Sequence, residues 1–192
     1  MQKIAIFASG AGSNARCIID HFHGSPTVRV DLVVCNKPGA GVIGIAEDAG
    51  IDVLPIDRER FLNGDAYLPV FRDRSISLLV LAGFLWKLPP ILIQAFPGQI
   101  VNIHPALLPR YGGKGMYGRH VHAAVLANGD KESGITIHQV DEHYDHGSII
   151  FQAHLAITPG ETPESLAHKV HELEHKHYPA VIERILKMQT AG

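Results

Sequence analysis

Cysteine is scarce in this chain of 192 residues, which contains only Cys17 and Cys35. The two lie far apart and form no C-x-x-C pair, so the sequence offers neither a disulfide framework nor a thiolate metal site. Reduced thiols are therefore the expectation, and they fit a protein of the cytoplasm.

The chain also lacks a long apolar run and an excess of charge of either sign. No segment approaches the roughly 20 apolar residues of a membrane span, and the N-terminal MQKIAIFASG is too short an apolar run for a signal peptide. Seventeen Lys and Arg face nineteen Asp and Glu, for a formal net charge of -2. That balance gives no general attraction to nucleic acid or to an anionic membrane. We therefore expect a cytoplasmic protein that has neither of them as a partner.

What the chain does have is an alternation of short aliphatic runs with stretches of helical character. The runs predicted as strands are 4–8, 29–35 and 78–82, and those predicted as helices are 13–22, 43–49 and 67–75. This rhythm is typical of an α/β fold with a mostly parallel central sheet and helices on both faces.

The C-terminal half is predicted to extend the same fold. The runs GITIHQVD (134–141) and GSIIFQAHLAI (147–157) read as further strands of the same sheet, followed by a final helix that Thr162 could cap. No repeat or low-complexity linker divides the chain, so residues 1–192 are expected to form a single domain.

A glycine-rich turn, FASGAGSNARCIID (7–20), follows the first predicted strand and opens a helix. Glycines permit a close backbone approach, and a helix N-terminus offers free amides to an anion. The turn is not a P-loop, and Arg16 stands where a dinucleotide fingerprint has a small residue. Phosphate binding by Gly12, Ser13 and Asn14 and a purely structural turn both remain open.

Two polar residues end the strand in QIVNIHPALLPRYGGKG (99–115). Asn102 and His104 are two residues apart and so lie on the same side of the sheet. An amide and an imidazole there suit polarisation and acid–base chemistry, although a turn Asn and a buried structural His fit the same pattern. Asp145, in VDEHYDHGSII (140–150), is either a turn residue or a carboxylate that raises the pKa of His104 and keeps it charged.

The stretch HELEH (171–175) fits the H-E-x-x-H pattern of zinc peptidases. With thirteen histidines in the chain, a chance match is unsurprising. A third ligand is also needed, and His168 and His177 belong to the same helix. We therefore disfavour a peptidase and expect no metal, although adventitious metal binding by this helix remains open.

Four separated motifs together carry a family resemblance. They are S-G-A-G-S-N (9–14), L-A-G-F (81–84), N-I-H-P-A-L-L-P (102–109) and V-D-E-x-x-D-x-G (140–147). From about Lys3 to Leu186 the chain resembles the phosphoribosylglycinamide formyltransferases, folate-dependent enzymes with a Rossmann-like fold. The resemblance implies transfer of a formyl group from 10-formyltetrahydrofolate to the amine of glycinamide ribonucleotide, a nucleotide-binding step of purine biosynthesis in one-carbon metabolism, without a metal.

The resemblance also implies site residues. Asn102, His104 and Asp145 match the catalytic trio, with a charged His104 and the Asn102 amide stabilising the tetrahedral intermediate. Gly12, Ser13, Asn14 and Glu174 match nucleotide-binding positions. The folate-binding positions are Leu85, Trp86, Lys87, Leu88, Asn102, Asp141, Glu142, His143 and Tyr144. For Trp86, simple core packing is an equal alternative.

The chain departs from the family pattern in two places. The loop 111–122 is longer than usual, and Gly64 and Asp65 stand where relatives carry a base for the folate tail, so that Lys87 or Lys114 is expected to compensate. Methionyl-tRNA formyltransferase and formyltetrahydrofolate deformylase share the trio but carry an additional domain, which we do not expect here. A non-enzymatic nucleotide-binding or metal-storage module would leave the trio idle. The sequence leaves monomer and homodimer open.

Overall fold

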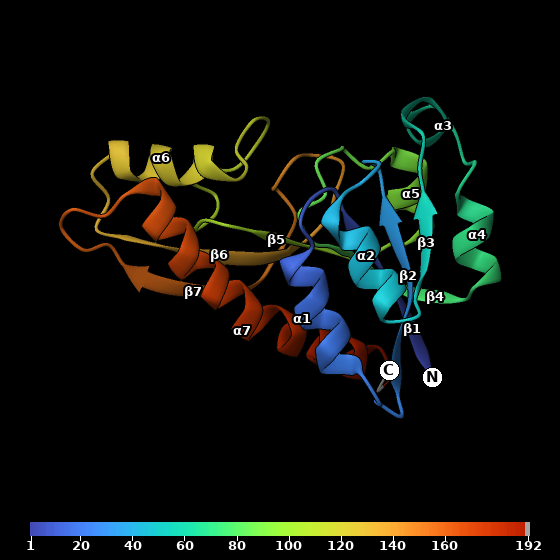
Figure 1. Ribbon diagram of the computed structural model, residues 1–192. Coiled ribbons are helices and arrows are strands. Elements are labelled where there is room, and N and C mark those ends of the chain that lie inside the picture. Colours follow the sequence, from blue (N-terminus) through green and yellow to red (C-terminus); the bar gives the residue numbers. More distant parts are fainter. Residues whose placement is uncertain (191–192) are drawn as a thin grey trace.

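The computed structural model describes residues 1–190, which form one β-sheet with helices packed on both faces (Figure 1). The strands are β1 (Gln2–Ala8), β2 (Val28–Cys35), β3 (Asp52–Pro55), β4 (Ile76–Leu81), β5 (Ile100–His104), β6 (Glu132–Gln139) and β7 (Ile149–Ala156). The helices are α1 (Ser13–Phe22), α2 (Gly41–Asp48), α3 (Arg58–Leu62), α4 (Leu68–Asp73), α5 (Pro90–Ala95), α6 (Arg119–Ala127) and α7 (Pro163–Thr190).

The strand order of the sheet is β3-β2-β1-β4-β5-β6-β7. The first five strands of the chain run parallel, whereas β6 and β7 pair antiparallel, β6 with β5 and β7 with β6. The predicted mostly parallel sheet with added C-terminal strands is confirmed. The short strand β3 and the helices α3, α5 and α6 were not predicted, and the strand predicted over 134–141 ends earlier, at Gln139.

Strand β1 shows why a strand without polar alternation sits at the centre of the sheet. Ile4 and Ile6 pack in one hydrophobic cluster with α1, α2 and α7, whereas Ala5 and Phe7 pack in the other with α3, α4 and α5. All four side chains are fully buried. A parallel strand covered by helices on both sides must be apolar on both sides, which is the pattern read from the sequence.

The long helix α7 crosses one face of the sheet beside α1 (Figure 1). Thr162 caps it as predicted, because its hydroxyl accepts a hydrogen bond from the Ser165 amide at 3.2 Å. The buried Tyr178 hydroxyl donates towards the carbonyl oxygens of Leu81 (2.9 Å), the last residue of β4, and Val101 (3.3 Å), the second residue of β5. Helix α7 is therefore tied directly to two strands.

The direction of the chain across the sheet reverses between β1 and β4, since β2 and β3 lie on one side of β1 and the later strands on the other. In open α/β sheets ligands bind outside the carboxyl ends of the strands at such a switch point. Among residues 1–190, no helix is long and apolar enough to cross a membrane.

Candidate active site

A cavity of about 750 Å³ opens at the carboxyl ends of β1, β4 and β5. It brings together segments far apart in sequence, including nearly every residue singled out above. Those lining it are Gly12, Ser13, Asn14, Leu85, Trp86, Lys87, Leu88, Asn102, His104, Asp141, His143, Tyr144, Asp145 and Glu174. Glu142 lies in the same loop as its neighbours but is exposed and outside the lining.

The loop after β1 forms one end of the cavity. Gly12 caps α1 with a positive φ of 84° and offers no side chain to the helix amides, which are left free for a ligand. A Cβ at Gly12 would lie 2.8 Å from the Cα of Val42, because α2 packs closely against the loop. The loop therefore needs glycine for its conformation and for the space.

Helix α7 meets this loop at Glu174, whose carboxylate accepts a hydrogen bond from the Asn14 amide at 2.8 Å. Glu174 is buried, and burial raises its pKa above the ordinary value. The Asn14 hydrogen bond and the nearby His175 act in the opposite direction but do not cancel this effect. His171, one turn earlier, also lines the cavity. Hydroxyl groups of a ligand would meet a ready acceptor at this position.

The segment after β4 forms the other end. Leu85 is exposed and Leu88 is buried, while Trp86 packs against Phe61 and Phe84 at ring-centroid distances of 6.0 and 6.2 Å. Trp86 thus joins the hydrophobic cluster of that face and lines the cavity too, so the two roles considered for it are compatible. Lys87 places its ammonium 5.8 Å from the centre of the Tyr144 ring.

The predicted trio converges between these ends. The His104 Nδ1 lies 3.6 Å from one oxygen of the Asp145 carboxylate, which also accepts a hydrogen bond from the Gly113 amide at 2.8 Å. Asn102 and His104 project from the same side of β5. Asp145 has a φ of 56°, a left-handed conformation uncommon outside glycine. A turn in this conformation aims the carboxylate at the imidazole.

His138 joins the trio and was not singled out from the sequence. It lies opposite Asn102 in the β5–β6 register, and its Nε2 is 3.1 Å from the Asn102 amide nitrogen. Its Nδ1 lies 2.7 Å from the carbonyl oxygen of Gln139 and so carries a proton, which lets the Nε2 of the neutral ring accept from Asn102. The same Nε2 lies 3.5 Å from the second oxygen of the Asp145 carboxylate. One N–H of Asn102 is then held, and the other is free to reach a ligand. The only indication in the sequence was that His138 is a polar residue within the apolar strand predicted over 134–141.

The electrostatics of His104 correct one prediction. Burial lowers the pKa of His104 below its ordinary value, while the Asp145 carboxylate and the Tyr111 carbonyl oppose that drop and His138 adds to it. The predicted influence of Asp145 has the right sign, but burial outweighs it. The prediction that Asp145 keeps the free imidazole charged is therefore wrong for the site without ligands.

The Asp145 carboxylate itself stays ionised. Burial pushes its pKa up, but His138, His104 and the Gly113 amide together hold the pKa below its ordinary value. Asp145 is thus a fixed negative charge between two imidazoles.

His122, on α6, is a further cavity-lining residue that sequence reasoning missed. It is buried and its Nδ1 has no hydrogen-bond partner. Burial, with His171 and His104 nearby, lowers the pKa of His122 to about 4. The imidazole is therefore neutral at pH 7.

The HELEH segment lies within α7 with its polar residues directed to different neighbours. Glu174 bonds Asn14, whereas Glu172 pairs with His168 on the exposed side at 3.4 Å. In residues 1–190 no group of three or more His, Cys, Asp or Glu side chains is arranged to hold a metal ion.

Fold and site together define a class of protein, an α/β enzyme that binds its ligands at the switch point of a mainly parallel sheet. The chain belongs to the formyl transferase family, whose sequence model matches residues 2–182.

Individual relatives agree with this assignment. The chain is 36% identical over 197 residues to phosphoribosylglycinamide formyltransferase of Bacillus subtilis, covering all of this chain and 98% of that one. It is 43% identical to the chloroplastic phosphoribosylglycinamide formyltransferase of Arabidopsis thaliana, covering 96% of this chain but only 65%, less than two thirds, of the relative. The crystal structure of the Bacillus halodurans phosphoribosylglycinamide formyltransferase superposes with a TM-score of 0.85 at 34% identity, covering 97% of this chain and 95% of the other.

Proposed function

We propose that this protein transfers a formyl group from 10-formyltetrahydrofolate to the amine of glycinamide ribonucleotide. The observation that carries the proposal is the convergence of Asn102, His104 and Asp145 in one cavity with two chemically different ends. The family match over residues 2–182 and the names of the relatives support the same reaction.

The nucleotide is assigned to the end formed by the β1 loop and α7. The free amides at the N-terminus of α1, around Gly12, Ser13 and Asn14, suit a phosphate group. Glu174, held by Asn14, suits the ribose hydroxyls as a hydrogen-bond acceptor. Both contacts use atoms that the fold leaves open to the cavity.

The folate is assigned to the other end. Leu85, Trp86 and Leu88 supply apolar surface beside Lys87, and the loop 141–144 closes the opposite wall. A flat, partly aromatic ligand with an anionic tail fits this combination of apolar surface with a cation.

The reaction forms a bond between the amine nitrogen and the formyl carbon and breaks the bond from that carbon to the folate nitrogen. Negative charge develops on the formyl oxygen, where the free N–H of Asn102 and the His104 imidazolium stabilise it. Burial favours neutral His104 in the free site, so His104 takes up a proton from solvent before the step, and the adjacent developing oxyanion favours this protonated form. The proton lost by the amine passes to the folate nitrogen, with Asp145 as the nearby acceptor. Holding both substrates in one cavity supplies a further part of the rate.

The test is formyl transfer to glycinamide ribonucleotide by chelator-treated protein, with His104→Ala and His175→Ala compared with wild type. We expect wild type and His175→Ala to transfer formyl without added metal, and His104→Ala to lose at least about a hundredfold in kcat. Absence of transfer by wild type, or transfer only after zinc is added, would overturn the proposal.

A further inference from the structure

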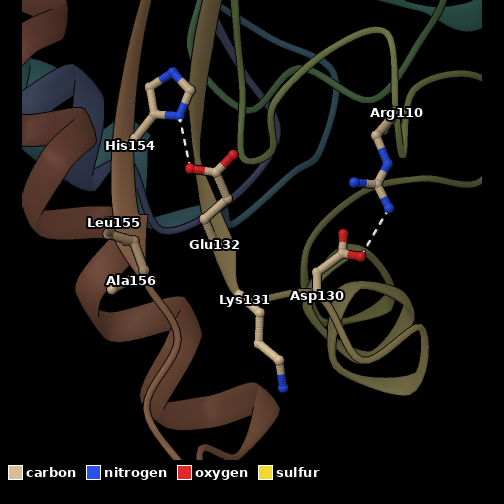
Figure 2. Close-up of a pocket in the computed structure, with 7 residues that line it drawn as sticks. All are labelled: Arg110, Asp130, Lys131, Glu132, His154, Leu155 and Ala156. Carbon is tan, nitrogen blue, oxygen red and sulfur yellow. Dashed lines mark hydrogen bonds and ion pairs between the residues drawn. The ribbon is translucent and has the colours of Figure 1, made fainter.

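A polar network on the outer surface leads inward to His104. Arg110 and Asp130 line a surface groove of about 540 Å³, and the Arg110 guanidinium contacts the Asp130 carboxylate at 2.7 Å (dashed line in Figure 2). The second oxygen of Asp130 accepts a hydrogen bond from the Tyr111 hydroxyl at 2.7 Å. The Asn128 amide donates to Asp130 as well, at 2.8 Å. Asp130, in the turn between α6 and β6, thus joins that turn to the loop after β5.

Tyr111 has an unusual backbone for a bulky residue. Its φ is 58°, in the left-handed region that costs free energy for a side chain with a Cβ. The hydroxyl contact with Asp130, and the Arg110 guanidinium 5.2 Å from the centre of the Tyr111 ring, hold the side chain that this backbone carries. These two side-chain contacts therefore stabilise the left-handed conformation of Tyr111.

The result of this conformation is a hydrogen bond inside the cavity. The carbonyl oxygen of Tyr111 lies 2.7 Å from Nε2 of His104. A carbonyl only accepts, so Nε2 carries a proton and Nδ1 is the nitrogen that titrates. Nδ1 is the atom that faces Asp145.

We propose that Asp130 and Tyr111 are positioning residues for His104: the Asp130 carboxylate fixes the Tyr111 backbone, whose carbonyl sets the orientation and tautomer of the imidazole. Neither residue's side chain needs to touch a substrate. The inference rests on the proposed function only in so far as His104 acts in formyl transfer.

The experiment compares three variants. Tyr111→Phe removes the hydroxyl contact and keeps the ring, and Asp130→Asn removes the charge. The matched control is Glu132→Gln, a carboxylate of the same groove that pairs with His154 rather than with Tyr111 (Figure 2). Steady-state kinetics and ¹⁵N NMR titration of the histidines in the ligand-free protein are measured for each.

We expect Tyr111→Phe and Asp130→Asn to lower kcat about tenfold, because a shifted imidazole is badly placed for the transition state. KM for both substrates should stay within about twofold, since neither side chain is a binding group. The groups that face His104 are the Tyr111 carbonyl, Asp145, His138 and His122. Because the Tyr111 carbonyl raises the pKa of His104, displacement of this carbonyl should lower that pKa and allow both neutral tautomers of the imidazole to be populated. Glu132→Gln should match wild type.

A Tyr111→Phe protein with wild-type kcat and an unchanged His104 titration would overturn the inference, even if its melting temperature fell. The NMR titration needs no activity, so it decides the positioning claim separately from the reaction. If wild type transfers no formyl group, the proposed function fails, whereas an altered His104 titration would still support the network.

Discussion

At Gly12 both the backbone conformation and the packing of α2 disfavour a side chain. Its φ of 84° disfavours any side chain, and an added Cβ would lie 2.8 Å from Val42 Cα, a backbone atom that does not move aside easily. We expect Gly12→Ala to lower the free energy of unfolding by about 2 to 4 kcal/mol, from strain and overpacking together. Urea denaturation measures this, and nucleotide binding should weaken as well.

Gly10 is the control in the same loop. No atom lies within 4 Å of a Cβ built there, and its φ is not in the left-handed region. Gly10→Ala should therefore change the free energy of unfolding by less than about 1 kcal/mol. Equal losses of stability in Gly12→Ala and Gly10→Ala would show that the tight packing of α2 against Gly12 does not cause the loss.

Under the proposed function, Lys87 is one of the two lysines of the cavity that could meet the folate tail. It lines the cavity, is exposed, and lies over the Tyr144 ring. We expect Lys87→Ala to weaken binding of a polyglutamated folate about three- to tenfold, more at low salt than at high salt, because the attraction is a screened charge interaction. An unchanged Kd measured by fluorescence titration would contradict this role, and Lys114→Ala, in the exposed loop, is the companion variant.

Some properties of single residues could be read from the sequence and some could not. The placement of Asn102 and His104 on one side of the sheet was predicted because positions two residues apart on a strand share a face, whereas their catalytic role was predicted from the family resemblance. The protonation state of His104 could not be predicted from the sequence, because it depends on burial and on the hydrogen bond with the Tyr111 carbonyl. No local sequence pattern predicts the left-handed backbone of Tyr111. His138 was missed for a similar reason, since only the β5–β6 register places it opposite Asn102.

At the scale of elements, one hydroxyl ties α7 to the neighbouring strands β4 and β5. Tyr178 is fully buried, and its hydroxyl bonds the carbonyls of Leu81 and Val101. We expect Tyr178→Phe to lower the free energy of unfolding by about 1 to 2 kcal/mol, because two buried acceptors lose a donor while the packing stays the same. Chemical denaturation checks this value.

Tyr144→Phe supplies the comparison for Tyr178→Phe. The Tyr144 side chain is 41% exposed, so water replaces any contact of its hydroxyl and stability should not change measurably. A Tyr178→Phe protein as stable as Tyr144→Phe would mean that the buried hydroxyl contributes nothing to the attachment of α7.

The elements found from the sequence are those with strong local signals. Helix α1 was predicted with its observed bounds because a glycine turn precedes it and the apolar spacing is regular. Strand β3 has four residues with no fully buried side chain, too short for a periodic signal. Helix α7 runs through Pro179, which by itself predicts a break. Packing of α7 on the sheet around Tyr178 overrides that local preference.

The whole molecule should become less stable in mild acid because of His122. Its pKa is lowered from 6.5 to about 4 in the folded state, so the unfolded chain takes up a proton at a pH where the folded protein does not. The associated stability is present above pH 6.5 and is lost as the pH falls towards 4. Between pH 7 and pH 5 the loss amounts to up to about 2 kcal/mol.

Urea denaturation of wild type and His122→Leu at pH 7 and pH 5 tests this expectation. The variant should lose up to about 2 kcal/mol less than wild type over the same interval. His154→Leu, which replaces an exposed imidazole on β7, should follow wild type. The same acid loss in wild type and His122→Leu would assign the effect to other groups.

The cavity is assembled from loops that follow different strands, one after β1, one after β4, one after β5 and one between β6 and β7, around residues on the end of β5. These loops are also bonded to one another, because the Leu85 amide donates to the Ser9 hydroxyl at 3.0 Å and the Gly113 amide donates to the Asp145 carboxylate at 2.8 Å. Under the proposed function, the acceptor and the formyl donor are held by separate loops. An engineer who exchanges one loop with that of a related enzyme, to change one substrate, would therefore have to keep its bonding partner on the neighbouring loop, Ser9 for the loop after β4 and Gly113 for the loop that carries Asp145.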